Sequence, residues 1–227
     1  MRSRAILTLL IPLACAALFV RLGVWQLSRL KEKRAFNTVL AGRLASPPAE
    51  VTTLPVDTGL GHYRRVSATG MMLYDREVVY AGRSHEGSPG VDLLTPMKIA
   101  GHDTVVMVNR GWAYSPDAAQ IVNARWKERD TTSVAGFAET FAGTERTVTG
   151  RRVHALDRAA IQTLVGLPIA PYVLVQTSDS SKHADSIPVR LTVPTLDEGP
   201  HQSYAMQWFG FALVAVIGGV ALSRRNH

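Results

Sequence analysis

Two long apolar runs lie near the ends of the chain. The first extends from Ala5 to Val20 and resumes after Arg21 as far as Leu27, and the second extends from Tyr204 to Leu222. As helices, these runs would rise roughly 34 Å and roughly 28 Å, close to the ~30 Å hydrocarbon thickness of a bilayer. The pattern predicts transmembrane helices over residues 5–27 and 203–222.

The first run also has features of a secretory signal. Arg2 and Arg4 precede it, and Ala14-Cys15-Ala16 could serve as a small-residue cleavage site or as a lipid attachment site at Cys15. Against both readings, apolar character resumes after Arg21, and Pro12 stands where a lipoprotein signal usually has leucine. We expect an anchor that is not cleaved.

The intervening residues 28–202 are polar and rich in turn residues, and we expect them to form one extracytoplasmic domain with an N-terminal helical stalk. The stalk should end at Ser46-Pro47-Pro48, because proline cannot continue a helix. Strand patterns and helical patterns then alternate with turns. Strands are predicted over 63–69, 73–80, 91–99, 104–108, 133–141, 146–153 and 172–176, helices over 116–126 and 156–165, a turn or mobile loop over 82–90, and a loop over 178–186.

Short strands joined by turns, with one clear helix, favour an antiparallel-rich α+β domain. The predicted fold class is an α+β membrane protein, in which two terminal transmembrane helices bracket an antiparallel-rich mixed α/β soluble domain. The sequence shows no internal repeat.

The basic balance of the chain points to lipid rather than to nucleic acid. The net charge is +7, but much of the excess lies beside the apolar runs, and there is no nucleic-acid recognition motif. Charge leaves the sidedness open, because Arg2, Arg4, Arg224 and Arg225 favour cytoplasmic termini while the basic residues from Arg29 to Arg34 pull the other way.

Recognisable enzyme motifs are missing from the sequence. It contains no phosphate-binding glycine loop and no G-x-S-x-G elbow, and no two of its histidines are spaced as local zinc ligands. Ser84-His85 is the one pair that could belong to a hydrolase. These motifs therefore indicate no enzyme class.

The most distinctive polar pattern lies at the start of the second apolar run. His201, Tyr204 and Trp208 are spaced to share one helix face. Because both helices meet the domain on the same side of the membrane, Trp25-Gln26 and Gln207-Trp208 should lie at similar depth. An aromatic belt explains the tryptophans, whereas the glutamines would seek a partner across the helix pair. Ala215, Gly218 and Gly219 could allow close approach of the two helices.

Two further elements have alternative interpretations. Arg21 either snorkels to the membrane surface or faces an anion. Asn109-Arg110-Gly111-Trp112 is either a turn, with the glycine at positive φ and the tryptophan in the core, or an exposed site where Arg110 and Trp112 bind a partner.

Several of these pieces together resemble the Surfeit-locus (Surf-one type) cytochrome c oxidase assembly family. The resemblance covers nearly the full chain and has two departures, at Pro200 and at Ala113-Tyr114. The matching motifs are Leu22-Gly23-Val24-Trp25-Gln26-Leu27-Ser28-Arg29-Leu30, Tyr63-Arg64-Arg65-Val66 with Gly70, Gly90-Val91-Asp92-Leu93-Leu94-Thr95-Pro96, Gly101 leading to Val108-Asn109-Arg110-Gly111-Trp112, and His201 with Tyr204-Ala205 and Trp208-Phe209.

The resemblance implies an assembly factor rather than an enzyme. Family members lie in the bacterial cytoplasmic membrane or the mitochondrial inner membrane, with both termini on the cytoplasmic or matrix side, and we expect the bacterial cytoplasmic membrane here. The protein's expected partners are the cytochrome oxidase catalytic subunit, haem a synthase and membrane lipids, and its expected cofactor is haem a. His201 would ligate the haem iron. Tyr204, Trp208, Trp25 and Gln26 would surround the ring, and Arg21 or Arg29 would meet the propionates. The alternative is a membrane-anchored interaction scaffold without a cofactor.

Overall fold

A computed structural model describes residues 2–145, 148–177 and 188–225. The chain divides into two compact units, one formed by Met1–Gly42 with Thr195–His227 and the other by Arg43–Pro194. The loop predicted over 178–186 lies outside the described residues, as does the start of the strand predicted over 146–153.

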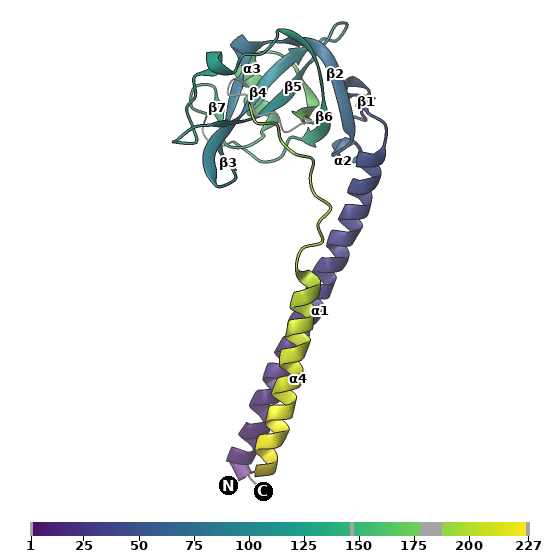
Figure 1. The fold of residues 1–227 in the computed structure, drawn as a ribbon, viewed down its shortest axis with the longest axis vertical. Coiled ribbons are helices and arrows are strands. Elements are labelled where there is room, and N and C mark those ends of the chain that lie inside the picture. The colour runs from purple at the N-terminus through teal and green to yellow at the C-terminus, as the bar shows by residue number, and fades with distance from the viewer. Residues whose placement is uncertain (1, 146–147, 178–187, 226–227) are drawn as a thin grey trace. The chain divides into compact units, whose positions relative to one another are not determined.

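The first unit is a pair of long helices, α1 (Arg2–Ala45) and α4 (His201–Arg225), which run antiparallel and side by side (Figure 1). The helix α1 is continuous over 44 residues, so the polar segment that we expected to be a separate stalk continues the apolar helix without a break. It ends just before Ser46-Pro47-Pro48, as predicted.

The two helices meet along positions that alternate four and three residues apart, the spacing of a coiled-coil seam. None of these positions is exposed. Opposite α4 they are Pro12, Ala16, Phe19, Gly23 and Gln26 on α1, and His201, Ala205, Trp208, Ala212, Ala215 and Gly219 on α4. On α1 the same spacing continues past the first residue of α4 through Leu30, Lys33, Asn37 and Leu40.

Two glycines bring the helices close together. A Cβ atom at Gly23 would lie 2.7 Å from the Phe209 ring, and one at Gly219 would lie 2.8 Å from Pro12 Cβ. The predicted close approach at Gly219 is therefore confirmed. The same prediction is wrong for Gly218, which faces outward with nothing within 4 Å of its Cβ position.

The outward faces of both helices are apolar, and most of their large side chains are about half exposed. Helices of this kind are typical of lipid contact, because a soluble protein rarely exposes so continuous an apolar surface. The segments Leu10–Ala45 and His201–Arg225 are both long and apolar enough to cross a membrane. The exposed side chains include Leu10, Ile11, Leu13, Leu18, Val20, Val24, Phe211, Leu213, Val214, Ile217 and Leu222.

The second unit is a β-barrel with short helices. Its strands are β1 (Ala49–Glu50), β2 (Arg65–Met72), β3 (Val78–His85), β4 (Ser88–Lys98), β5 (Val105–Tyr114), β6 (Thr131–Thr140), β7 (Arg152–Val153) and β8 (Ile169–Gln176). Its helical turns are η1 (Val51–Thr53), α2 (Thr58–Gly61), η2 (Tyr74–Arg76), η3 (Asn123–Trp126) and α3 (Arg158–Val165).

Five of these strands close into a ring in the order β2-β6-β8-β5-β4, because β2 also pairs with β4. Within the ring, β5 and β8 are parallel and the other pairs are antiparallel. This connectivity is that of the five-stranded OB-type barrel. The domain is therefore antiparallel-rich, as predicted. The closure of its sheet into a barrel was not predicted.

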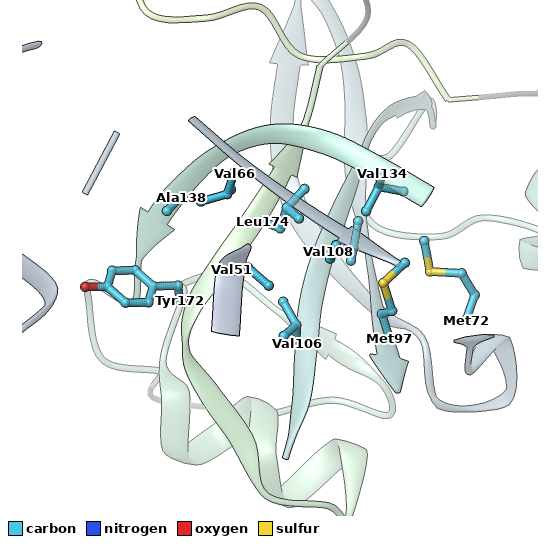
Figure 2. Close-up of a cluster of buried hydrophobic side chains, with 11 residues drawn as sticks. Val51, Val66, Met72, Met97, Val106, Val108, Val134, Ala138, Tyr172 and Leu174 are labelled. Atoms are coloured by element: carbon cyan, nitrogen blue, oxygen red, sulfur yellow. The ribbon is translucent and has the colours of Figure 1, made fainter. Parts of the chain in front are cut away.

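The barrel interior holds a core of valine, leucine, methionine and alanine side chains (Figure 2). Tyr172 lies at the edge of this core, and its hydroxyl points away from the other side chains (Figure 2) and donates to the Pro55 carbonyl (2.6 Å). Outside the barrel, α3 covers a second apolar cluster that includes Ile161 and Val173. The predicted helix forms because Asp157 caps its start and Gly166 (φ 70°) ends it.

Two sequence predictions are corrected here. The segment 82–90, predicted as a turn or mobile loop, contains the turn at Glu86 and Gly87, which both have positive φ, but its other residues pair as the ends of β3 and β4 and do not form a loop. The helix predicted over 116–126 is reduced to η3, because the Asp117 carboxylate accepts N–H groups of Ala119 and Gln120 and holds a turn instead. Those hydrogen bonds lower the pKa of Asp117 to about 2.

Candidate functional site

The candidate site lies where α4 begins against the middle of α1. His201 is the first residue of α4, and its Nδ1 is 2.9 Å from Oε1 of Gln26. Both side chains are half-buried on the helix seam. A glutamine partner across the helix pair was predicted, and Gln26 confirms it, whereas Gln207 is exposed.

The contact leaves the other ring nitrogen of His201 free for chemistry. In the tautomer whose Nδ1–H donates to the carbonyl oxygen of Gln26, the lone pair lies on Nε2. Nε2 lies beside Gly199, where an added Cβ would come within 3.5 Å of it. Among the contacts of the described residues, none is a hydrogen bond to Nε2. The arrangement can therefore present a single ligating nitrogen.

The loop before α4 is fixed to α1 by polar contacts. Arg34 donates to both carboxylate oxygens of Glu198 (3.0 and 2.9 Å), and Asn37 Nδ2 donates to the carbonyls of Leu196 (2.9 Å) and Asp197 (3.1 Å). These side chains were missed in the sequence. The signal that could have found Asn37 is its place in the four-and-three spacing that includes Gln26.

The start of α4 follows directly from the local sequence. Pro200 precedes the helix, and its carbonyl accepts the N–H of Tyr204 (3.1 Å) and the hydroxyl of Ser203 (2.8 Å). Proline is well suited to a helix start because its fixed φ is close to helical. The departure from the family at Pro200 is therefore compatible with placing His201 on the seam.

An aromatic cluster lies about 10 Å further along α4 at a rise of 1.5 Å per residue. The Trp208 ring stacks on Phe19 of α1 with centroids 5.8 Å apart and an interplanar angle of 25°. Phe211 packs edge-on against Trp208 at 5.9 Å. His201 and Trp208 thus share the seam face, as their spacing predicted.

The other predicted site residues do not converge on His201. Tyr204 and Trp25 are 46% and 52% exposed, at the edge of the seam and on its flank. Arg21 is exposed, and five residues before Gln26 it lies about 140° around α1 from the seam. Arg29 is exposed and pairs with Glu32 at 2.7 Å.

Arg110 and Trp112 are not the exposed pair that partner binding would need. Both lie in β5, where Arg110 is 1% exposed and Trp112 is 8% exposed. Gly111 has φ 120°, and a Cβ there would lie 2.2 Å from the Val189 carbonyl oxygen. The core interpretation of the tryptophan and the glycine is therefore correct, although the residues form a strand rather than a turn.

Ser84 and His85 do not face one another as a nucleophile and its base would. These neighbours lie in β3, so their side chains project to opposite faces. The His85 ring packs against Trp112 at 5.3 Å. Within the described residues there is also no group of three or more metal-ligating side chains.

The chain thus comprises a barrel unit and two terminal helices that are long and apolar enough to cross a membrane, and the second helix begins at a histidine that contacts a glutamine of the first. The sequence profile of the SURF1 family matches residues 13–213, and the chain belongs to that family.

Relatives from bacteria and from a eukaryote match over most of their length. The chain is 28% identical over 227 residues to a SURF1-like protein of Rickettsia felis, covering 96% of this chain and 97% of that protein. It is 27% identical over 216 residues to that of Rickettsia conorii, covering 92% and 88%. With the SURF1-like protein of Monosiga brevicollis it shares 24% identity over 219 residues, covering 90% and 83%.

Proposed function

We propose that this protein is an assembly factor for a haem–copper cytochrome oxidase, and that it assists haem a delivery to the catalytic subunit or stabilises that subunit during biogenesis. The observation that carries the proposal is the His201–Gln26 contact. It places an imidazole ring at the edge of an apolar helix pair, with Nδ1 held by Gln26.

The residues present fit the iron-binding half of a haem site. Bound haem would supply an iron that accepts an imidazole nitrogen as axial ligand. His201 would provide that nitrogen, and the absence of a side chain at Gly199 leaves space beside it. Tyr204, exposed at the seam edge, and Trp208 offer aromatic surface nearby, although one face of Trp208 already packs on Phe19.

Neither of the two arginines expected to bind the haem propionates is placed beside His201 and free to do so. Arg21 faces away from the seam, so we do not assign it to a propionate. Arg29 is nearer in the helix register to Gln26, but it is paired with Glu32. An exposed ion pair of this kind contributes little, so Arg29 can exchange its partner at small cost.

We place both helices in the bacterial cytoplasmic membrane, with the termini in the cytoplasm and the barrel unit outside. The outward apolar faces of the helices support insertion, and the basic tails support cytoplasmic termini. The oxidase catalytic subunit and haem a synthase would be the partners. The chain would act by binding and handing over, without a reaction of its own.

A scaffold without a cofactor is the second candidate, and exposed apolar side chains on the barrel unit favour it. Val56, Tyr114 and Val122 are 86%, 57% and 74% exposed. Single exposed apolar side chains are normal on a folded surface, so these three support a partner site only if they form one contiguous patch. Under this alternative the barrel unit, rather than His201, carries the function.

The visible absorption spectrum of protein purified from cells that make haem a tests the proposal. Haem should co-purify with the wild type and be lost from His201→Ala. His102→Ala, which changes an exposed histidine of the barrel unit, should retain it. Equal haem content in all three proteins would remove His201 from the mechanism. Co-purification of the catalytic subunit without any haem would favour the scaffold.

A further inference from the structure

We propose that Gln26 is a positioning residue that holds His201 in the tautomer with the proton on Nδ1, so that Nε2 is the nitrogen available to a ligand. The identity of the ligand rests on the proposed function, whereas the tautomer of His201 does not depend on it. The Gln26 amide, a polar group on the seam of an apolar helix pair, thereby has a role.

The geometry of the contact supports this assignment. Oε1 of Gln26 is 2.9 Å from Nδ1 of His201, and a carbonyl oxygen can only accept, so the ring must donate from Nδ1. A neutral imidazole has a single N–H, which leaves the electron pair on Nε2. The hydrogen bond made by one ring nitrogen thus decides what the other can bind.

The surroundings hold the amide in place. Gly23 and Leu30, its neighbours along the seam of α1, are both buried, as is Ala205 on α4. A polar contact is stronger in such a place than in water, because water competes for it less. The amide is therefore half-buried in a stretch of the seam whose neighbouring positions are buried, and its contact with the ring is present without any ligand.

The segment before α4 keeps Nε2 accessible. Gly199 has φ 69°, a conformation that favours glycine, and its N–H donates to the Asp197 side chain at 2.9 Å. A Cβ at position 199 would stand 3.5 Å from Nε2. The Arg34–Glu198 pair holds the same segment against α1. One side of the ring is thus fixed, and the other is kept free of side chains.

A glutamine suits this role better than a carboxylate would. Both can accept the Nδ1 proton, but a carboxylate would also stabilise the imidazolium ion, which has no free nitrogen. The neutral amide orients the ring without favouring its cation. In histidine sites for metals, an outer hydrogen-bond partner of this kind fixes the tautomer and strengthens the ligand.

The tautomer is measured directly in the full-length, ligand-free protein in lipid nanodiscs, by NMR of ¹⁵N-labelled histidine rings. His201→Ala identifies the signals of His201. The wild type should show a protonated Nδ1 and an unprotonated Nε2. Gln26→Met keeps the size of the side chain and removes the amide, and it should shift His201 toward the tautomer with the proton on Nε2, the form that free imidazole side chains prefer.

Gln207→Met is the matched control, because Gln207 is an exposed glutamine of α4 that does not contact His201. It should leave the His201 signals unchanged. A protonated Nε2 in the wild type would overturn the proposal, since the amide would then donate to the ring. An unchanged tautomer in Gln26→Met, with helix content preserved by circular dichroism, would overturn it too.

Titration with iron(III) protoporphyrin IX separates this inference from the proposed function. If both hold, Gln26→Met should weaken axial ligation by about tenfold or more, the usual cost of losing an outer hydrogen-bond partner. If the tautomer depends on Gln26 but no variant binds the porphyrin, the positioning role stands and the haem function fails. If the porphyrin binds through His201 and the tautomer ignores Gln26, the positioning role fails alone.

Discussion

Arg110 and Glu77 form an ion pair inside the barrel unit, with Nη2 2.6 Å from Oε2 and both side chains 1% exposed. The guanidinium also donates to Thr95 Oγ1 (2.8 Å), to the Trp126 carbonyl (2.6 Å) and to Glu128 Oε1 (2.9 Å). The cluster joins β4, β5 and the segment before β6. An exposed docking residue was one interpretation of Arg110, but all three of its guanidinium nitrogens donate inside the fold.

Replacing Arg110 should destabilise the barrel strongly. Arg110→Met leaves the buried Glu77 carboxylate without its counter-ion, which typically costs about 3–5 kcal/mol. Arg110→Lys should recover only part of this loss, because an ammonium cannot reproduce the planar fork. Urea unfolding of the full chain in detergent, monitored by circular dichroism, measures the difference.

The control for this prediction is Lys98→Met, which changes an exposed cation at the end of β4. It should stay within about 0.5 kcal/mol of the wild type. Adding Glu77→Gln to Arg110→Met should restore part of the stability, since the orphaned charge is removed. An Arg110→Met protein as stable as Lys98→Met would show that the ion pair does not hold the barrel.

Two neighbouring glycines of α4 offer a matched pair of substitutions, because Gly219 lies on the seam and Gly218 is exposed. Gly219→Leu should push the helices apart, because even its Cβ would lie 2.8 Å from Pro12 Cβ. Gly218→Leu should be tolerated, because nothing lies within 4 Å of that position. Spin labels at the exposed residues Val20 and Val214 would report the helix separation. Equal distance distributions in the two variants would contradict the seam.

Asp92 should make the barrel less stable as the pH rises. Burial raises the pKa of this carboxyl above 3.8, although Arg83 and the Asn109 amide partly offset the effect. The folded state therefore binds the proton more tightly than the unfolded state, and the cost of ionisation is absent below 3.8 and fully present above the folded pKa.

Asp92→Asn tests this pH dependence, because the amide does not titrate and can still accept from Asn109. The variant should match the wild type at low pH and become the more stable of the two as the pH rises. Thermal unfolding from about pH 3.5 to about pH 8 covers the window. Asp103→Asn, an exposed change in the β4–β5 turn, is the control. A stability difference that shrinks with rising pH would contradict the sign.

Tyr172 anchors the segment before α2 to the barrel. Its hydroxyl lies 2.6 Å from the Pro55 carbonyl and 3.0 Å from that of Asp57. Tyr172→Phe should cost about 1–2 kcal/mol, because one donor is lost and its acceptors are left unsatisfied. Gly61→Ala should also destabilise, since its Cβ would meet the Tyr172 hydroxyl at 2.2 Å. Chemical unfolding of both variants gives the comparison.

The sequence by itself determined the elements that depend on nearby residues, such as apolar runs, helix caps and turn residues. The apolar runs specified α1 and α4, Asp157 and Gly166 specified the ends of α3, and Ser46-Pro47-Pro48 ended α1. The hairpin of β4 and β5 was also readable, because its strands flank Gly101-His102-Asp103. In each case the signal lies within a few residues of the structure it produces, as periodicity, capping and turn chemistry require.

Tertiary structure alone decided the closure of the barrel, the burial of Arg110 and the partner of His201. Closure depends on the β2–β4 pairing, and register between strands is set by packing rather than by either strand alone. From sequence alone Arg110 is expected at the surface, because its burial depends on counter-charges from Glu77 and Glu128, which are not its neighbours in the chain. Gln26 and His201 are 175 residues apart in sequence, and only the antiparallel register of two helices brings an acceptor to that ring nitrogen.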